Sequence, residues 1–401
     1  MGRRRRRERH ARPRSDEPTV TLGRKLERVL RQGHPWIWRE ALPHLDAPVG
    51  TAVAVLAPDG TFVARGVVDD GPIGVRVFSL APRERIDSAL FARRIARAAA
   101  LRDRVIDPAV TDAYRLLHGE GDGLPGHVCD VYGPCAVMRF DGGGAAAWAE
   151  VVRDALVPTL RRRGVETLVV RRGRRHERTL EVAFGPAPPD RHRVREHGMN
   201  MWVDVMHGQK TGLFLDHRPS RRRLRELSAG QSVLNLYGYT GAFSTAAGLG
   251  GAARVVTVDV AGGALALAQH AWADNGLDPA RHETRIADVP RYLAENDACF
   301  DIIVADPPSF APRASAVPAA LAAYERLHAA CLDRLRPGGL YLAASCSSHV
   351  PRDTFDATVF AAARRRRRPL QVLGKWGAGE DHPRLPAFVE GDYLKALLVC
   401  G

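Results

Sequence analysis

The stretch of residues 232–310 constrains the fold of this chain more than any other. It begins SVLNLYGYTGAF, in which a short apolar run stops at a glycine turn and an Ala-rich helical segment follows. Two later apolar runs, RVVTVD and DIIVAD, end on Asp259 and Asp306. Strands that end in order on a glycine turn and two carboxylates predict a Rossmann-like α/β sheet with a ligand site at its carboxyl edge.

The glycine turn predicts how a ligand approaches that edge. Gly238 and Gly241 allow the backbone to turn sharply and to come close to a ligand. Asp259 lies 21 positions after Gly238, near the spacing at which a carboxylate accepts hydrogen bonds from ribose hydroxyls. A nucleoside-containing ligand is therefore expected.

The form of the turn separates this ligand from a dinucleotide. A dinucleotide site uses G-x-G-x-x-G, whereas this turn reads G-Y-T-G and a later strand ends in D-P-P. The combination resembles class I S-adenosylmethionine-dependent methyltransferases, which implies S-adenosylmethionine as cofactor and Asp259 as its ribose ligand. For Asp288 two interpretations stay open, a place near the adenine or the N-cap of a helix over PRYLAEN. The candidate cofactor-binding residues are Asn235, Tyr237, Gly238, Thr240, Gly241, Asp259, Asp288, Asp306 and Pro307.

The composition indicates which kind of partner and which cellular compartment to expect. The 401 residues carry a formal charge of +14, which favours a polyanionic partner such as RNA, although the Arg-rich first residues supply much of it. Six scattered cysteines without a C-x-x-C pair indicate neither a disulfide framework nor a metal site. No apolar run approaches the ~18 residues of a membrane span, and no signal peptide is recognisable. We expect a cytoplasmic protein; whether it forms a homodimer is left open.

Changes in composition and in hydrophobic pattern along the chain predict four segments. Residues 1–18 form an Arg-rich tail that should be disordered. Residues 19–87 alternate short strands with turns, and the G-H-P-W-I-W entry resembles a PUA domain, a small RNA-binding β-barrel. Residues 88–197 combine helices near 88–104 and 145–163 with glycine-punctuated strands, which indicates a small central α+β domain. Residues 198–401 form the Rossmann-like domain, entered through a β-hairpin made of 201–205 and 213–215.

The segment that leads into the Rossmann-like domain, together with later motifs, resembles one known family in particular. G-Q-K-T-G-L-F-L-D-x-R, L-N-L-Y-G-Y-T-G-A-F, D-P-P-S-F, S-C-S and the ending D-H-P-R-L-P…E-G-D-Y-L-K together resemble the PUA-containing large-subunit rRNA cytosine-C5 methyltransferases, over roughly residues 20–400. His217 departs from the usual glutamine of D-Q-R. The resemblance places the hairpin beside the cofactor cleft; the alternative is a structural pair of Asp216 with Arg218 or Lys210. The substrate or RNA-binding candidates are Lys210, Phe214, Asp216, Arg218, Pro308 and Ser309.

The predicted chemistry centres on Cys346. This cysteine follows the strand GLYLAAS, so it and Asp306 should both emerge at carboxyl ends of parallel strands. Carbon 5 of cytosine is a poor nucleophile, and addition of a thiolate to carbon 6 turns the ring into an enamine-like species that can attack a sulfonium methyl group. Asp306 is placed to hydrogen-bond ring nitrogen 3. We therefore predict both as catalytic residues, against the alternative of an inert buried cysteine.

Two other functions stay open. D-P-P-S also resembles the D-P-P-[YFW] of amino-methyltransferases, which would methylate a purine nitrogen of RNA without a cysteine. The chain could also be an RNA-binding protein with a methyltransferase fold that no longer turns over. The target nucleotide, the form of the rRNA substrate and the base that removes the carbon-5 proton are not identified by the sequence.

Overall fold

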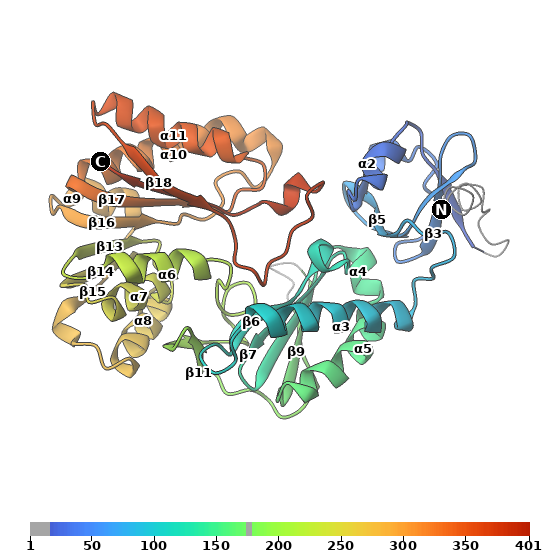
Figure 1. The fold of residues 1–401 in the computed structure, drawn as a ribbon, viewed down its shortest axis with the longest axis horizontal. Helices are drawn as coiled ribbons and strands as arrows, with labels where there is room; N and C mark the ends of the chain where they lie inside the picture. Colours follow the sequence, from blue (N-terminus) through green and yellow to red (C-terminus); the bar gives the residue numbers. More distant parts are fainter. Residues whose placement is uncertain (1–16, 174–178) are drawn as a thin grey trace.

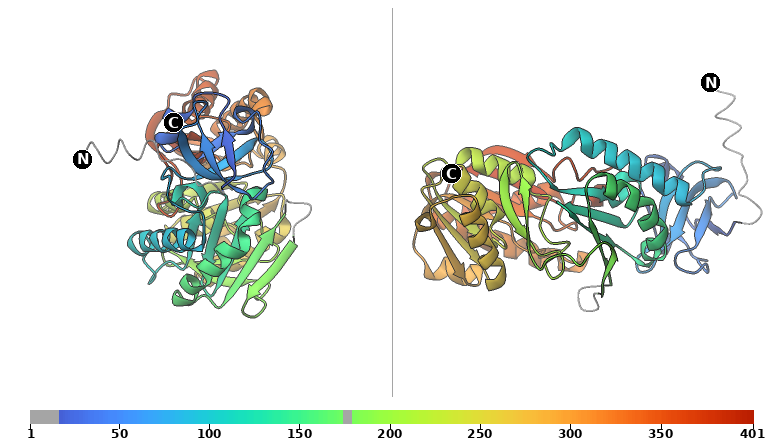
Figure 2. Two further views of the ribbon diagram at one scale, coloured as in Figure 1. Left: turned by 90° about the vertical axis from the view of Figure 1, so that its right-hand side faces the viewer. Right: turned by 90° about the horizontal axis from the view of Figure 1, so that it is seen from below.

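The computed structural model describes residues 17–173 and 179–401, so most of the predicted Arg-rich tail lies outside the described residues. Three units follow one another along the long axis of the molecule, with the central unit between the other two (Figures 1 and 2). Each unit is built on its own sheet, as the sequence predicted.

The N-terminal unit is a five-stranded sheet of order β1-β3-β4-β5-β2. Its strands alternate with turns at Gly60 and Gly71, both with positive φ, which explains why the apolar runs break there. Ile37, Val53 and Val75 are fully buried in its small core. The elements are β1 (Thr19–Thr21), α2 (Glu27–Arg31), β2 (Trp36–Trp38), β3 (Ala52–Leu56), β4 (Phe62–Val68) and β5 (Ile73–Ser79).

The central unit packs two helices against a second five-stranded sheet, of order β10-β9-β8-β7-β6. Its first helix begins at Ser88, where the Asp87 side chain accepts a hydrogen bond from the backbone N–H of Leu90 at 2.9 Å. The single helix predicted near 145–163 is interrupted at Trp148. The elements are α3 (Ser88–Val105), β6 (Ala113–His118), β7 (His127–Tyr132), β8 (Cys135–Phe140), α4 (Gly143–Ala147), α5 (Ala149–Arg162), β9 (Thr167–Arg172) and β10 (Thr179–Phe184).

The predicted entry hairpin is wrong in its pairing. The strand near 201–205 is β12 (Met199–Val203), and it pairs with β11 (His192–Glu196), which precedes it. Residues 213–215 belong to no strand; Leu213 and Leu215 are buried in a core that includes Val203 of β12 and Tyr132 of β7. The predicted boundary at 197/198 therefore cuts the turn of this hairpin, and we propose that the C-terminal unit begins at His192.

The C-terminal unit is a seven-stranded sheet of order β15-β14-β13-β16-β17-β19-β18. The first five strands are parallel and β19 is antiparallel to both neighbours. Its chain elements are β13 (Ser232–Leu236), β14 (Arg254–Asp259), β15 (His282–Ile286), β16 (Phe300–Ala305), β17 (Leu335–Ser345), β18 (Gln371–Trp376) and β19 (Lys395–Cys400). Its helices are α6 (Arg218–Leu227), α7 (Ala242–Leu249), α8 (Gly262–Asp274), α9 (Val289–Glu295), α10 (Val317–Asp333) and α11 (Arg352–Arg365).

Helices cover both faces of this sheet, which is why its parallel strands are almost continuously apolar. Leu234 faces a core that includes Tyr324 of α10 and Phe355 of α11. Val233, its neighbour in β13, faces the opposite core with Trp272 of α8. The strand order changes direction at β13, so the carboxyl ends of β13, β14 and β16 form the switch point at which ligands bind.

A loop of the C-terminal unit, residues 377–394, reaches the other two units, and we call it the bridging loop (Figure 1). Its Phe388 ring lies 4.5 Å, centroid to centroid, from Trp36 of the N-terminal unit. Its Asp381 carboxylate accepts a hydrogen bond from the backbone N–H of Arg115 in the central unit at 2.9 Å. The bridging loop thus fastens the catalytic sheet to both preceding units.

Candidate active site

The glycine turn after β13 is held by the carboxylate that ends β14. Asp259 accepts hydrogen bonds from the backbone N–H groups of Tyr239 (2.9 Å, to Oδ2) and Ala261 (2.8 Å, to Oδ1). Each carboxylate oxygen has a further lone pair, so this arrangement leaves Asp259 able to accept from ribose hydroxyls. The turn is tightly wound, since Tyr237 and Tyr239 have φ angles of 58° and 47°.

Two glycines of the turn have no room for a side chain. A Cβ on Gly238 would clash with the Thr257 methyl group, and one on Gly241, whose φ is 72°, would clash with Ala268 of α8. Thr240 lies between them and is buried. The backbone therefore passes close to both β14 and α8, and the close approach of these glycines to a ligand stays a prediction.

Gly241→Ala should lower the free energy of unfolding by about 1–3 kcal/mol, because alanine would have to occupy a left-handed backbone conformation beside Ala268. The shift of the turn should also weaken S-adenosylmethionine binding. Urea unfolding and calorimetric titration with the cofactor measure the two effects. The matched control is Gly263→Ala in α8, where a new Cβ meets no atom within 4 Å; a comparable loss in that variant would contradict the strain argument.

The remaining cofactor candidates fit a nucleoside ligand. Asn235 is buried and donates from Nδ2 to Ser244 Oγ at 2.8 Å, while its Oδ1 has no hydrogen-bond partner among the described residues. Val260 follows Asp259 at the carboxyl end of β14 and is 69% exposed. Ile286 lies opposite Asp259 at the carboxyl end of β15 and is 72% exposed. We infer that these two apolar side chains, which the sequence reasoning missed, flank an adenine. Their only sequence signal is an apolar residue exposed at each strand end.

Asp288 caps a helix, which is one of the two interpretations left open. Its Oδ1 accepts a hydrogen bond from the backbone N–H of Arg291 at 3.2 Å, at the start of α9. A contact of the same residue with the adenine stays a prediction, as does the role of Tyr237, which is half-buried against the core under β13.

The loop of residues 204–217 packs against the glycine turn. The Tyr239 hydroxyl accepts a hydrogen bond from the backbone N–H of Gln209 at 2.9 Å and donates to the carbonyl of Gly212 at 3.3 Å. The Phe214 ring meets Tyr239 edge-on, 5.5 Å between centroids. Lys210 sits in this loop with a φ of 53°. The loop thus lies beside the cofactor turn, although it is not the hairpin predicted there.

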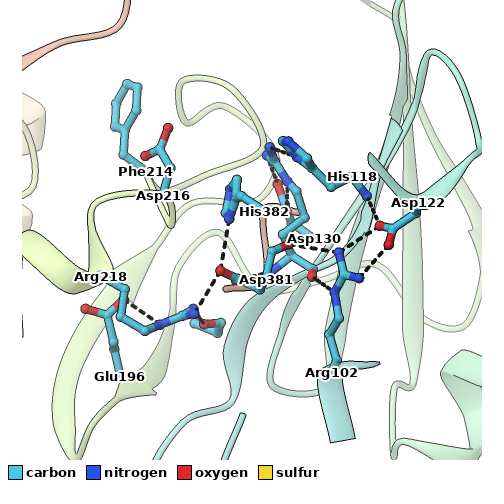
Figure 3. Close-up of polar contacts among 12 residues, drawn as sticks. Arg102, His118, Asp122, Asp130, Glu196, Phe214, Asp216, Arg218, Asp381 and His382 are labelled. Carbon is cyan, nitrogen blue, oxygen red and sulfur yellow. Dashed lines mark hydrogen bonds and ion pairs between the residues drawn. The ribbon is translucent and has the colours of Figure 1, made fainter. Parts of the chain in front are cut away.

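Arg218 is a structural residue, which corrects its prediction as an RNA-binding candidate. Its side chain is 3% exposed and lies between two buried carboxylates, with Nη1 at 3.0 Å from Asp381 and Nε at 3.4 Å from Glu196 (Figure 3). It also donates from Nη2 to the carbonyl of Ala113 at 2.8 Å. An arginine enclosed in this way cannot present its charge to an RNA phosphate.

Asp216 stands apart from that network. Among the ion pairs of residues 17–173 and 179–401 it pairs with neither Arg218 nor Lys210, so the alternative of a structural ion pair is wrong. Its Oδ2 accepts a hydrogen bond from the Tyr393 hydroxyl at 2.8 Å. Burial tends to raise the pKa of this carboxyl, but His217, His382 and the Tyr393 hydrogen bond outweigh it and leave the pKa lowered.

Asp306, at the end of β16, is paired with the histidine that replaces the usual glutamine. His217 Nε2 lies 3.2 Å from Asp306 Oδ2, and His217 Nδ1 lies 3.1 Å from Ser220 Oγ. Burial lowers the pKa of His217, yet the charge of Asp306 and its hydrogen bond leave that pKa raised. The departure at position 217 therefore places a proton-carrying group against the D-P-P aspartate. Pro307 is buried behind Asp306, and Pro308 is exposed.

Cys346 follows β17, directly beside the end of β16. Burial, and then the charge of Asp306, raise the pKa of its thiol to about 11, while Lys210 acts in the opposite direction. The free protein therefore holds a protonated thiol at neutral pH, and nucleophilic attack requires its proton to leave. The sequence placed Cys346 and Asp306 at adjacent strand ends, and the structure brings both together with the loop that carries Lys210.

The loop that follows Cys346 is fixed by hydrogen bonds from a buried lysine for which the sequence analysis predicted no role. Lys395 of β19 is 1% exposed and donates from Nζ to the carbonyls of Ser347 (2.6 Å) and Val350 (2.9 Å). Burial lowers its pKa to about 8. Ser309 Oγ lies 3.0 Å from Ser347 Oγ, which joins the D-P-P-S segment to the same loop. Lys395 ends the E-G-D-Y-L-K motif, the only sequence signal for it.

Neither a metal centre nor a membrane span occurs in the described part of the chain. No group of three or more His, Cys, Asp or Glu side chains within residues 17–173 and 179–401 could hold a metal ion. None of the helices in those ranges is long and apolar enough to cross a bilayer.

The sheet order, the glycine turn and the two strand-end aspartates define a class I S-adenosylmethionine-dependent methyltransferase. The family model of that description matches residues 156–399, and a PUA-like domain matches residues 20–80. Proteins called Ribosomal RNA large subunit methyltransferase I from Alteromonas mediterranea and Shigella boydii serotype 4 are each 34% identical to this chain, over 94% of it and 98% and 97% of their own lengths. The chain belongs to the Ribosomal RNA large subunit methyltransferase I family.

The fold agrees with solved relatives. The crystal structure of the methyltransferase SMU.776 complexed with SAH matches with a TM-score of 0.86 at 23% identity, and covers 96% of this chain and 100% of that one. The predicted α/β fold, with a PUA-like N-terminal domain and a methyltransferase domain at the C-terminus, is therefore confirmed, as is S-adenosylmethionine as the cofactor.

Proposed function

We propose that this protein methylates carbon 5 of a cytosine in large-subunit rRNA, and that Cys346 is the nucleophile. The observation that carries the proposal is the adjacency of Cys346 and Asp306 at the carboxyl ends of β17 and β16. The names of the relatives supply the substrate class. We further propose that the protein acts in the cytoplasm.

S-adenosylmethionine, held by the glycine turn and Asp259, supplies an electrophilic methyl group. The Cys346 thiol first loses its proton to solvent water, and the thiolate sulfur then adds to carbon 6 of the cytosine and makes carbon 5 nucleophilic. Lys210 stabilises the thiolate, since its charge opposes the rise in the thiol pKa. The Asp306–His217 pair hydrogen-bonds ring nitrogen 3 and provides the proton that nitrogen gains as the sulfur adds.

The PUA-like unit fits the role of an RNA-binding module. Trp36 is not free to stack on a base, because it packs against Phe388 and donates from Nε1 to Glu120 at 2.8 Å. We therefore assign the module's RNA affinity to its surface charge and shape, and the bridging loop keeps it in place relative to the catalytic sheet. A base stacked in rRNA must be flipped out to reach the sheet edge.

Methyl transfer from labelled cofactor into large-subunit rRNA tests the proposal directly. The substrates are an unmodified transcript and unmethylated large subunits, and the RNA is digested to nucleosides. We expect the label in 5-methylcytidine alone. Label in a methylated purine would favour the amino-methyltransferase alternative that D-P-P-S suggests. Cofactor binding without transfer to either substrate would favour the non-catalytic alternative.

A further inference from the structure

The proposed carbon-5 reaction, on which this inference rests, contains a step without an assigned residue. After methyl transfer, carbon 5 of the sulfur-bound cytosine carries both the new methyl group and its original proton. The thiol cannot leave until a base removes that proton, and the base must lie close to Cys346. Four charged groups surround Cys346. Asp306 ends the neighbouring strand, Lys395 pairs with Ser345 in the sheet, and Lys210 lies in the loop of residues 204–217. Asp216 is placed there by its neighbour His217, which is paired with Asp306, and by its hydrogen bond to Tyr393, just before β19.

Three of these four groups are committed to other tasks. Lys395 lies beneath the loop, with Nζ bonded to two backbone carbonyls. Lys210 is a cation that favours the thiolate. Asp306 is paired through Oδ2 with His217, in the position suited to ring nitrogen 3. Among the described residues, Asp216 is a carboxylate near the nucleophile that neither pairs with a cation nor faces ring nitrogen 3, and its Oδ1 has no hydrogen-bond partner.

The two oxygens of Asp216 differ in their surroundings. Oδ2 is fixed by the Tyr393 hydroxyl at 2.8 Å, and the backbone carbonyl of Asp216 accepts from the N–H of Gly379 at 3.1 Å. Oδ1 is buried and has no hydrogen-bond partner among the described residues. A buried carboxylate oxygen without a donor costs free energy, so its retention points to a partner that is present only when substrate is bound.

The direction of the side chain agrees with that reading. Figure 3 shows the Asp216 carboxylate beside the Phe214 ring, both turned away from the buried network of Arg218, Asp381 and Glu196. Phe214 in turn packs on Tyr239 of the cofactor turn. Asp216 thus lies in the segment that packs on the cofactor turn, next to the His217 that is paired with Asp306.

We propose that Asp216 is the base that removes the carbon-5 proton. Its Oδ1 takes the proton, the electron pair of the C5–H bond forms the C5=C6 double bond, and the C6–S bond breaks. The sulfur of Cys346 leaves with the electron pair of that bond, and the proton on ring nitrogen 3 returns to the Asp306–His217 pair. The products are 5-methylcytosine in the RNA, a Cys346 thiolate and a protonated Asp216.

Asp216→Asn tests this assignment, because the amide keeps the shape but cannot accept the proton. On an unmodified large-subunit rRNA transcript we expect Asp216→Asn to form the sulfur adduct and to transfer one labelled methyl group. The labelled RNA should then stay attached to the protein on a denaturing gel, and release of 5-methylcytidine should fall by about a hundredfold or more. Wild type should show no such accumulation.

The matched control is Tyr393→Phe, which removes the hydroxyl on Oδ2 but leaves the base. Its turnover should stay within about tenfold of wild type, the effect of one hydrogen bond, without a trapped complex. Asp216→Asn that turns over normally, or that loses methylation without accumulating an adduct, would overturn the assignment.

A transcript containing 5-fluorocytidine separates this inference from the proposed function. Fluorine at carbon 5 cannot be removed as a proton, so wild type and Asp216→Asn should both be trapped to the same extent. Trapping of wild type but not of Asp216→Asn would show that Asp216 acts before proton removal and would overturn the inference alone. Failure of wild type to be trapped would overturn the carbon-5 reaction, and the inference with it.

Discussion

Replacement of Cys346 by alanine should abolish methylation of RNA, with a loss of about 10⁴-fold or more, as expected when the nucleophile of a covalent mechanism is removed. Without sulfur addition to carbon 6, carbon 5 of cytosine stays too weak a nucleophile to take the methyl group. The readout is label in 5-methylcytidine at saturating cofactor. Cofactor affinity should be unchanged, because the glycine turn and Asp259 do not involve Cys346.

Cys299→Ser is the matched control, since this cysteine is exposed at the far end of β16 from the site. It should retain full activity. Methylation that survives in Cys346→Ala would contradict the covalent mechanism, and its label in a purine nucleoside would move the chemistry to the D-P-P-S segment.

The largest effect on stability is expected from Asp381→Asn. Asp381 is fully buried in the bridging loop, with Arg218 Nη1 at 3.0 Å, His382 Nδ1 at 2.9 Å and the backbone N–H of Arg115 at 2.9 Å. Loss of its charge would leave the buried Arg218 guanidinium with Glu196 as its one remaining carboxylate, so the free energy of unfolding should fall by about 3–5 kcal/mol. Urea unfolding at neutral pH measures the difference.

The same variant should show a defined dependence on pH. Burial raises the pKa of Asp381, but His382 and Arg218 outweigh it and hold that pKa well below its ordinary value of 3.8. A carboxyl group whose pKa is lower in the folded than in the unfolded protein stabilises the folded state. This contribution is complete at pH values above the pKa of the unfolded state and is lost as the pH falls towards the pKa of the folded state. The difference between wild type and Asp381→Asn should therefore be constant above about pH 5 and shrink in stronger acid.

Asp297→Asn provides the comparison at the surface. Asp297 is 96% exposed and pairs with Arg334 Nη1 at 3.0 Å. Its loss should cost less than about 1 kcal/mol, because water screens the pair. Equal effects of the two substitutions would show that the bridging loop contributes little to the folded state.

Local patterns were sufficient to predict the catalytic unit. Apolar runs of strand length with a glycine turn, Asp259, Asp306 and Cys346 at their ends predicted β13, β14, β16 and β17. Such a pattern is local: a buried parallel strand must be apolar over its whole length, and the polar residue after it must lie at the sheet edge. The bounds of α3 were predicted to within one residue by the same kind of signal.

Pairing over long distances was not predictable in this way. The apolar residues Leu213 and Leu215 were predicted to form a strand, yet they are buried as part of a loop. The strand β12 pairs with β11 instead. Arg218 was an RNA-binding candidate because the family resemblance placed its segment beside the cofactor cleft. Only the fold brings Glu196 and Asp381 to it from either side.

The sequence by itself determined the class of fold, the cofactor turn and the pair of strand ends that carry Cys346 and Asp306. These features depend on backbone geometry and on burial within short segments. The tertiary structure decided which polar groups meet: His217 with Asp306, Tyr393 with Asp216, and Lys395 with the carbonyl of Ser347. The physical reason is that hydrogen bonds and ion pairs between distant segments depend on how the units and the bridging loop pack, which no local pattern records.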